Sequence, residues 1–394
     1  MPAREIASGI FAVGVIDWDR TLFDELIPLP DGTTYNAYLV KGSEKIALID
    51  TVDPTKEEEF VLNLVRLGIG AIDYIIINHA EQDHSGSLPM ILELFPMATI
   101  VSTAKCRELL VSLLGIPDIR FKTVEDGDTI DLGGKTLEFL HTPWVHWPET
   151  MLTYERESKI LFSCDLFGSH YATSDLFHSD ESACYEPAKR YYAEIMMPFR
   201  GSIRGYLDRL ATYEIAAIAP SHGPAYGRPA FILDAYRDWT SDEVKNEVVI
   251  LYVSMHGSTR KMVEYLTTAL IKRDITVRLF NVTVADIGKV AMSLVDAATI
   301  VVAAPTVLFG PHPRMVAVAY IAGVLRPGVR NAAIIGSYGW GGKTVKVLGD
   351  LLQGIKANML EPVYTQGLAK EDTLKKLDQL ADEILKKHKD DRIV

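Results

Sequence analysis

The chain has 394 residues, of which 40 are Lys or Arg and 52 are Asp or Glu, so its net charge is −12. This acidic balance argues against nucleic acid as the main partner, because phosphate binding needs a basic surface, and no apolar run approaches the roughly 20 residues of a membrane span. The N-terminus lacks the apolar core of a secretion signal, and three widely spaced cysteines without a C-x-x-C pair exclude a thiolate iron–sulfur site, so we expect a cytoplasmic protein with reduced thiols.

The first part of the chain, from residue 34 to about residue 245, mixes short apolar segments with helical patterns. Apolar runs predict strands at 36–40, 45–50, 71–78, 98–102, 119–124, 135–142, 159–165 and 215–223. Helical spacing predicts helices over 56–68 and 85–95. The charged stretch 241–247 is predicted as a linker, which gives a first domain of residues 1–246.

The second part, residues 247–394, alternates regularly between strands and helices. Strands are predicted at 247–254, 275–282, 298–306 and 331–339, and helices at 258–273, 284–294, 315–325, 344–355 and 371–388. Strands that are apolar on both faces and separated by helices indicate a doubly wound parallel sheet. The sequence therefore predicts two unlike domains, divided between residues 246 and 247.

The segment INHAEQDHSGS, residues 77–87, places four potential metal ligands within six residues: His79, Glu81, Asp83 and His84. It follows an apolar run, so a buried strand would fix the loop that carries these side chains. In an extended stretch His79, Glu81 and Asp83 would share one side, because side chains alternate along a strand. This spacing predicts a metal site at the end of the strand.

Three further ligands are predicted at the ends of other strands: His146, Asp165 and His222. Each follows an apolar strand and enters a turn with Gly or Pro. Four other histidines are interpreted as solvated or hydrogen-bonded residues: His141, His170, His178 and His312.

The pattern H-x-E-x-D-H with the later His, Asp and His resembles the metallo-β-lactamase family, whose dizinc members usually carry H-x-H-x-D-H. Glu81 replaces the second histidine with an anionic oxygen donor, which favours iron or manganese over zinc. In the redox branch of that family the residue at the position of His84 commonly does not bind metal. We therefore expect His84 to hydrogen-bond near the site without binding the metal.

Three loops of the second part predict a mononucleotide site. VSMHGST, residues 253–259, joins a strand to a helix N-terminus that attracts phosphate, and it resembles the flavodoxin phosphate loop. APTVLFGPHP and SYGWGGK follow two further strands, and no G-x-G-x-x-G fingerprint is present, which favours FMN over FAD or NAD. The predicted FMN contacts are Ser254, Met255, His256, Gly257, Ser258, Thr259, Pro305, Thr306, Val307, Leu308, Phe309, Gly310, Ser337, Tyr338, Gly339, Trp340 and Gly341.

The two sets of motifs together resemble the flavodiiron proteins, also called A-type flavoproteins, in their short form without a C-terminal extension. The resemblance implies an α/β chain in which a metallo-β-lactamase-like αββα domain precedes a flavodoxin-like domain. It also implies two irons and one FMN per chain. His79, His146 and Glu81 would hold one iron, Asp83 and His222 the other, and Asp165 would bridge them.

The same resemblance implies an oxidoreductase that reduces dioxygen to water, nitric oxide to nitrous oxide, or both. Electrons would pass from an external donor, such as rubredoxin or the deazaflavin coenzyme, through FMN to the diiron site. A head-to-tail homodimer, alone or as a dimer of dimers, would bring the flavin of one chain to the iron of the other. The preferred gas and the donor stay open at this point.

Two other functions fit parts of the sequence. One is a dizinc hydrolase of the lactamase fold with a fused flavodoxin-like domain, against which Glu81 argues. The other is an electron-transfer or sensor protein with a vestigial metal site, against which the six intact ligand types argue.

Overall fold

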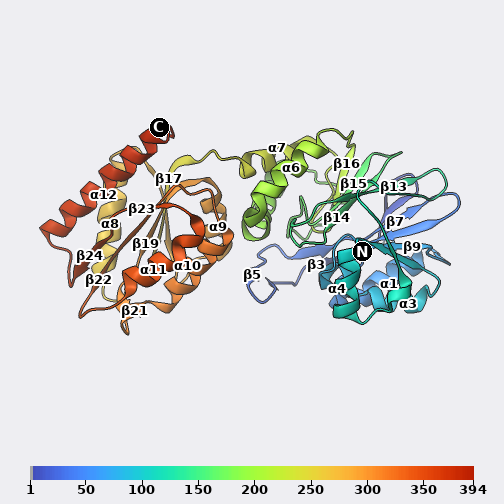
Figure 1. Cartoon of the computed structure of the whole chain (residues 1–394), viewed down its shortest axis with the longest axis horizontal. Helices are drawn as coiled ribbons and strands as arrows, with labels where there is room; N and C mark the ends of the chain where they lie inside the picture. Colours follow the sequence, from blue (N-terminus) through green and yellow to red (C-terminus); the bar gives the residue numbers. More distant parts are fainter. Residues whose placement is uncertain (1–2) are drawn as a thin grey trace. The chain divides into compact units, whose positions relative to one another are not determined.

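The computed structural model describes residues 3–394, and the chain divides into two compact units (Figure 1). The first unit extends to Tyr192 and resumes at Phe199–Thr240, and the second contains Ala193–Pro198 and Ser241–Val394. Strand β17 (Lys245–Tyr252) begins inside the predicted linker, so that prediction was wrong for residues 245–247. The domain boundary at residue 246 stays a prediction.

Two mixed sheets form the centre of the first unit. The larger has the order β1 (Arg4–Ala7), β2 (Ile10–Ala12), β7 (Tyr38–Lys41), β8 (Ile46–Ile49), β9 (Tyr74–Ile76), β10 (Thr99–Ser102) and β11 (Phe121–Thr123). The smaller has the order β12 (Thr129–Asp131), β13 (Thr136–His141), β14 (Met151–Glu155), β15 (Ile160–Cys164) and β16 (Ala217–Pro220). Two short pairs accompany them: β3 (Val15–Asp17) with β6 (Thr33–Tyr35), and β4 (Leu22–Phe23) with β5 (Ile27–Pro28).

The helices of this unit are α1 (Glu57–Arg66), α2 (Gln82–Ser85), α3 (Leu88–Leu94), α4 (Ala104–Leu114), α5 (Glu181–Tyr191), α6 (Arg200–Leu210) and α7 (Pro229–Thr240). One buried cluster joins the facing sides of the two sheets, as Ile49 and Phe139 illustrate. Another packs α1, α3 and α4 on the outer face of the larger sheet, through residues such as Phe60 and Leu110. Successive apolar side chains along the strands of the larger sheet thus point alternately into these two cores, as expected for a sheet between two layers.

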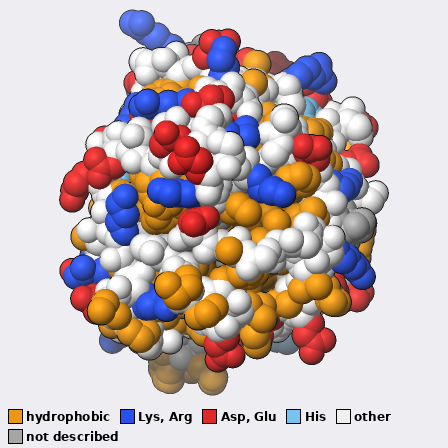
Figure 2. All heavy atoms as spheres, turned by 90° about the vertical axis from the view of Figure 1, so that its right-hand side faces the viewer, with side chains coloured by type: hydrophobic (Ala, Val, Ile, Leu, Met, Phe, Trp, Pro, Cys, Tyr) orange, Lys and Arg blue, Asp and Glu red, His pale blue; other side chains and the backbone are white. Residues whose placement is uncertain are grey.

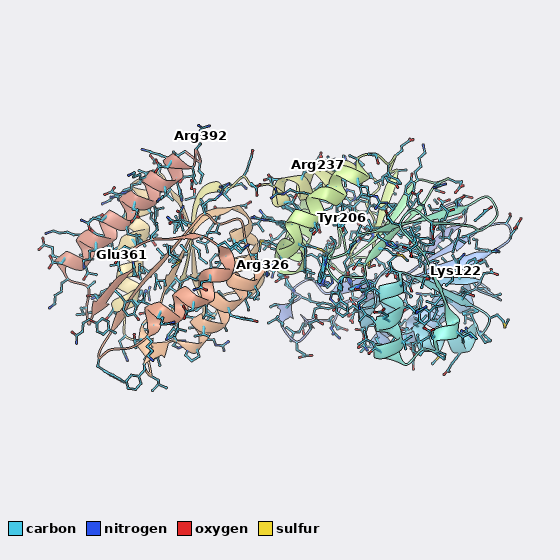
Figure 3. The ribbon with its side chains drawn as sticks, viewed as in Figure 1. Lys122, Tyr206, Arg237, Arg326, Glu361 and Arg392 are labelled. Atoms are coloured by element: carbon cyan, nitrogen blue, oxygen red, sulfur yellow. The ribbon has the colours of Figure 1, made fainter. Side chains whose placement is uncertain are left out.

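Local sequence explains where the elements begin and end. The Thr103 hydroxyl accepts a hydrogen bond from the Cys106 amide and caps α4, which ends at Gly115 with a φ of 66°. Helix α1 has three glutamates in its first turn and Arg66 in its last, which complements the helix dipole. Tyr206 of α6, labelled in Figure 3, donates from its hydroxyl to the carbonyl of Pro143 (3.0 Å) and so ties α6 to the loop that carries His146.

The second unit contains a parallel sheet in the order β18 (Thr276–Asn281), β17, β19 (Ala297–Ala303), β22 (Asn331–Tyr338), with β23 (Asn358–Met359) and β24 (Val363–Gln366) both pairing β22. This is the 2-1-3-4-5 order of flavodoxin-like folds. One core lies under α9 (Ile287–Asp296), α10 (Pro313–Leu325) and α11 (Thr344–Leu352). The other lies under α8 (Ser258–Ile271) and α12 (Glu371–Asp390), and a hairpin of β20 (Thr306–Val307) and β21 (Gly310–Pro311) follows β19.

The face of the molecule in Figure 2 carries charged side chains of both signs. On the face in Figure 2, acidic and basic side chains are interspersed with apolar ones, without a continuous basic stripe. Among residues 3–394, no helix is both long enough and apolar enough to cross a membrane.

Candidate active site

The six predicted metal ligands are delivered by loops at the ends of four strands. His79, Glu81 and Asp83 follow β9, and the others follow β13, β15 and β16. Strands β13 and β15 both run antiparallel to β14, and β16 is parallel to β15. The three loops therefore leave the smaller sheet at the same edge, which is why residues far apart in sequence meet.

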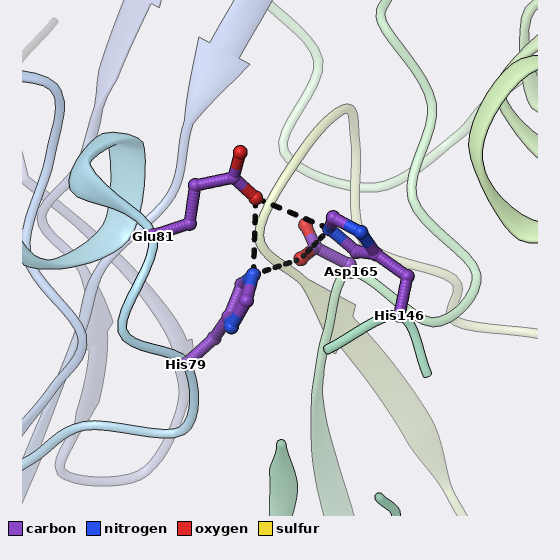
Figure 4. A group of neighbouring side chains, drawn as sticks. All are labelled: His79, Glu81, His146 and Asp165. Carbon is purple, nitrogen blue, oxygen red and sulfur yellow. Dashed lines mark hydrogen bonds and ion pairs between the residues drawn. The ribbon is translucent and has the colours of Figure 1, made fainter. Parts of the chain in front are cut away.

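His79, Glu81, His146 and Asp165 form a first group of side chains (Figure 4). The Nε2 atoms of His79 and His146 lie 3.1 and 3.2 Å from Glu81 Oε2. The same nitrogens lie 3.6 and 3.3 Å from Asp165 Oδ2. Two imidazoles and two carboxylates thus direct one atom each toward a common point.

Asp83, His84 and His222 form a second group on the other side of Asp165. His222 Nε2 lies 3.1 Å from Asp83 Oδ2 and 3.4 Å from Asp165 Oδ1. His84 Nε2 lies 3.1 Å from the same Asp165 oxygen and 3.3 Å from Asp83 Oδ1. Asp165 therefore presents Oδ2 to the first group and Oδ1 to the second.

The extended geometry expected for this segment was wrong after Glu81. Residues Gln82–Ser85 form the helical turn α2, so Asp83 does not continue the alternation of His79 and Glu81. The turn instead brings Asp83 and His84 to the second group. The prediction that His84 does not bind metal stays a prediction, and its Nε2 lies as near to Asp165 as the ring of His222 does.

The donor atoms fit cations. Both Asp83 oxygens, Asp165 Oδ2 and His84 Nε2 are buried without a hydrogen-bond partner. Buried polar atoms nearly always have partners, so atoms that converge without a hydrogen bond fit a bound positive ion. Carboxylate and imidazole donors suit iron or manganese. The buried Cys164 thiol lies near His84 and Asp165, and burial raises its pKa, which favours the neutral thiol over a thiolate ligand.

The histidines and carboxylates of the site are strongly coupled. Burial lowers the pKa of His79, but Glu149 and Glu81 outweigh it and raise that pKa to about 10. Burial likewise lowers the pKa of His222, and Asp165 with Asp83 raises it to about 10. A cation bound at these atoms would displace the protons of the rings.

Three contacts that the sequence did not predict orient the ligands. His79 Nδ1 lies 2.7 Å from Glu149 Oε1, which also accepts from the Ala80 amide at 3.0 Å. His222 Nδ1 lies 2.7 Å from the backbone carbonyl of Thr34. With Nδ1 held in this way, Nε2 is free to face a metal.

Tyr191 supplies the third of these contacts. It is buried in α5, and its hydroxyl donates to Asp165 Oδ1 at 2.8 Å. No spacing signal marks such residues, because tyrosine is common on buried helix faces and its partner is 26 residues away.

The β4–β5 hairpin lies beside the second group. Phe23 is buried, and its ring centroid is 6.4 Å from that of His222. Burial raises the pKa of the next residue, Asp24, and the charges of Glu81 and Asp83 raise it further. The hairpin therefore adds an acidic group near the site that the motif search did not identify.

Ten of the predicted FMN residues line a hollow of about 200 Å³ at the ends of β17, β19 and β22. It is lined by Ser254, Met255, His256, Ser258, Thr259, Pro305, Thr306, Ser337, Tyr338, Gly339 and Gly367. All except Gly367, which follows β24, were predicted from the sequence. Helix α8 begins here after Gly257, whose φ is 89° and which has no side chain to cap the helix. The Ser254 hydroxyl accepts from the Arg260 amide at 3.3 Å, and the positive end of the helix can receive a phosphate.

The other predicted FMN residues lie outside this lining: Gly257, Val307, Leu308, Phe309, Gly310, Trp340 and Gly341. Phe309 and Trp340 are exposed, and their rings meet edge to face with centroids 4.6 Å apart. Two exposed aromatic rings beside a polar hollow suit a flat ring system that stacks on them. The contacts predicted for all these residues stay predictions.

Comparisons with known proteins show the family and the fold of the chain. The family model described as "ODP family beta lactamase" matches residues 33–223. A nitric oxide reductase of Moorella thermoacetica is 34% identical over 362 residues, covering 90% of either chain.

Two solved structures resemble the whole chain. One is the rubredoxin oxygen:oxidoreductase of Desulfovibrio gigas, with a TM-score of 0.95, 29% identity and complete coverage of both chains. The other is the flavodiiron protein of Giardia intestinalis, with a TM-score of 0.89, 29% identity and coverage of 98% of this chain and 96% of that one. The predicted fold class, a lactamase-like domain followed by a flavodoxin-like one, is confirmed.

Proposed function

The chain belongs to the flavodiiron proteins, and from this premise we propose that it is an oxidoreductase that reduces dioxygen to water, nitric oxide to nitrous oxide, or both. The observation that carries the proposal is the pair of side-chain groups that share Asp165, with unpartnered donor atoms in each. The hydrolase alternative is not favoured, because the relatives are named as reductases and Glu81 replaces an imidazole.

Residues of the two groups would hold two irons. His79, His146 and Glu81 would bind one and Asp83 with His222 the other, while each oxygen of Asp165 faces one group. When bound, a diiron pair and a reduced FMN together supply the four electrons that take one dioxygen to two waters. A pair of nitric oxide molecules needs two of these electrons.

The chain's own residues fix and shield this chemistry. Glu149 and the Thr34 carbonyl hold the Nδ1 atoms of two ligand rings, so the rings do not rotate away from the metal. The Trp147 ring packs edge-on against His79 with centroids 5.0 Å apart and covers it. Tyr191 holds a proton on its hydroxyl at Asp165 Oδ1, next to the atoms that would bind the metal.

The hollow at the end of the parallel sheet would bind FMN. The α8 N-terminus with Ser258 and Thr259 suits its phosphate, and Trp340 and Phe309 suit its ring. In this proposal residues 1–246 form the diiron domain and residues 247–394 the FMN domain of a cytoplasmic enzyme. An external donor, such as rubredoxin or the deazaflavin coenzyme, supplies the electrons.

The proposed assembly is a head-to-tail homodimer, alone or paired into a dimer of dimers. The two parts of the chain carry net charges of opposite sign. Residues 1–240 have 20 Lys and Arg and 36 Asp and Glu, whereas residues 241–394 have 20 Lys and Arg and 16 Asp and Glu. Opposite charges favour an arrangement in which the FMN part of one chain meets the diiron part of the other. Analytical ultracentrifugation at low and high salt tests this dimer, and an active monomer would contradict the proposed assembly.

The function is tested by gas consumption. Protein purified without oxygen and containing iron and FMN is supplied with reduced rubredoxin, and the uptake of dioxygen and of nitric oxide is followed separately. We expect turnover of at least one gas and two irons per chain. Active protein that contains two zincs instead would support hydrolysis and overturn the proposal.

A further inference from the structure

The turn that carries His222 has no helix or strand of its own to hold it. Residues 221–223 follow β16 as a bend, and Gly223 has a φ of 81°, a left-handed conformation that favours glycine. A Cβ at Gly223 would clash with the Ser169 hydroxyl, and the Ser169 backbone amide donates to the His222 carbonyl at 3.0 Å. The position of the His222 ring is therefore set by contacts from other segments.

Most of these contacts come from residues 33–38, which contain β6 and the first residue of β7. The side-chain amide of Asn36 donates to the backbone carbonyl of Pro220 at 2.8 Å and to that of Gly223 at 2.7 Å. These two carbonyls lie on either side of His222 in the sequence. One side chain thus bridges both ends of the turn.

Thr34 holds the same turn at two further points. Its hydroxyl accepts from the Gly223 amide at 2.7 Å, and its backbone carbonyl lies 2.7 Å from His222 Nδ1. The hydroxyl fixes the backbone of the turn, and the carbonyl fixes the ring. Tyr38 adds a second hydrogen bond to the Pro220 carbonyl at 2.7 Å. The ring and the turn are thus held by one short segment of the chain.

The histidine of the first group is held by a different part of the chain. His79 Nδ1 lies 2.7 Å from the Glu149 carboxylate, far in the sequence from residues 33–38. Thr34 is buried, Asn36 is half-buried, and both side chains are uncharged. Replacing either side chain with an uncharged one therefore moves the turn of His222 without changing the charge around the two groups.

We propose that Asn36 and Thr34 are positioning residues, which fix the turn of His222 and so determine how tightly the second group of side chains binds its iron. The inference rests on the proposed function, because it takes Asp83 and His222 to hold one of the two irons. A ligand ring that is held in place loses less freedom when the metal binds, and loss of such outer contacts weakens binding about tenfold or more.

The variants separate this role from general stability. Thr34→Val removes the hydroxyl and keeps the shape of the side chain, whereas Thr34→Ser keeps the hydroxyl; both keep the backbone carbonyl. Asn36→Ala removes the bridging amide. Asn63→Ala is its matched control, because the Asn63 amide also bridges two backbone carbonyls of the same unit, those of Val13 and Gly14 at 3.0 Å each, and neither belongs to a ligand turn.

The measurement is the affinity for Fe²⁺ in anaerobic competition with a chromogenic chelator. His222→Ala removes a ligand of the second group and so identifies the affinity of the first. We expect Thr34→Val and Asn36→Ala to bind the iron of the second group about tenfold more weakly and the other iron as the wild type does. Thr34→Ser and Asn63→Ala should match the wild type, and the FMN content should be equal in all variants.

The outcomes distinguish this role from the proposed function. Wild-type affinity in Thr34→Val or in Asn36→Ala would overturn the role of the residue replaced. Equal weakening at both metal positions, or a Thr34→Ser variant as weak as Thr34→Val, would overturn the selective action on His222. Wild-type protein that binds two irons but reduces neither gas would overturn the proposed function alone, and wild-type protein that binds no iron would overturn both.

Discussion

Replacing Glu149 with Gln tests whether this buried carboxylate controls the metal site through His79. The side chains of both residues are 0% exposed, and Nδ1 and Oε1 are 2.7 Å apart. Gln keeps an oxygen for the ring and for the Ala80 amide but removes the negative charge that makes the ring a stronger ligand. Loss of such an outer partner weakens metal binding about 10- to 100-fold, or roughly 1.4–2.8 kcal/mol.

The assay is competition for Fe²⁺ between the protein and a chromogenic chelator under anaerobic conditions. Glu155→Gln is the control, because Glu155 is equally buried but accepts from the Ser158 amide (2.8 Å) instead of a ligand. FMN content should be equal in wild type and both variants. Unchanged iron affinity in Glu149→Gln, or equal losses in the two variants, would refute the role of Glu149.

Three further predictions concern the two sites and the C-terminal helix. His79→Ala should abolish gas reduction while FMN stays bound, because the flavin hollow lies in the other unit; residual turnover would contradict the ligand assignment. Trp340→Ala should weaken FMN retention with iron content unchanged, measured by equilibrium dialysis of the flavin, and full retention would contradict ring stacking. His388 is buried between Thr299 and Asn246, and burial lowers its pKa below the unfolded value of about 6.5. The unfolded state therefore binds more protons in acid. The free energy of unfolding measured in urea should be highest above that pH and decrease below it. His388→Gln should make this decrease smaller.

Much of the fold was predictable because its strands are short apolar runs between clear breaks. In the second unit every predicted strand and helix is present, because most strands are apolar runs buried on both faces; the edge strand β18 is an exception, since it has no buried residue. β24 was missed because VYTQ is short and only partly buried, so its pattern is weak. The segment after Glu81 was predicted as extended, yet four polar residues form a helical turn there, and apolar periodicity carries no information about such a segment.

The candidate ligands were predictable for a different reason. Each follows an apolar strand. The strands β13, β15 and β16 end at the same edge of the smaller sheet, so ligands that follow these strands in the sequence lie close together in space. The residues that orient the ligands were not predictable. Glu149 acts on a ring 70 residues away, and Thr34 acts through its backbone carbonyl, which any residue would supply.

These outer partners also make the two metal positions unequal. In the first group His79 is hydrogen-bonded to a buried carboxylate, whereas in the second His222 is hydrogen-bonded to a neutral carbonyl. An anionic partner pushes more electron density onto a ligand ring than a carbonyl does. Because Asp165 serves both groups through different oxygens, the difference between the positions depends on the histidine partners, and the position near His79 should bind its cation more strongly. A protein that loses one iron first on gentle chelation should therefore lose it from the group of Asp83 and His222.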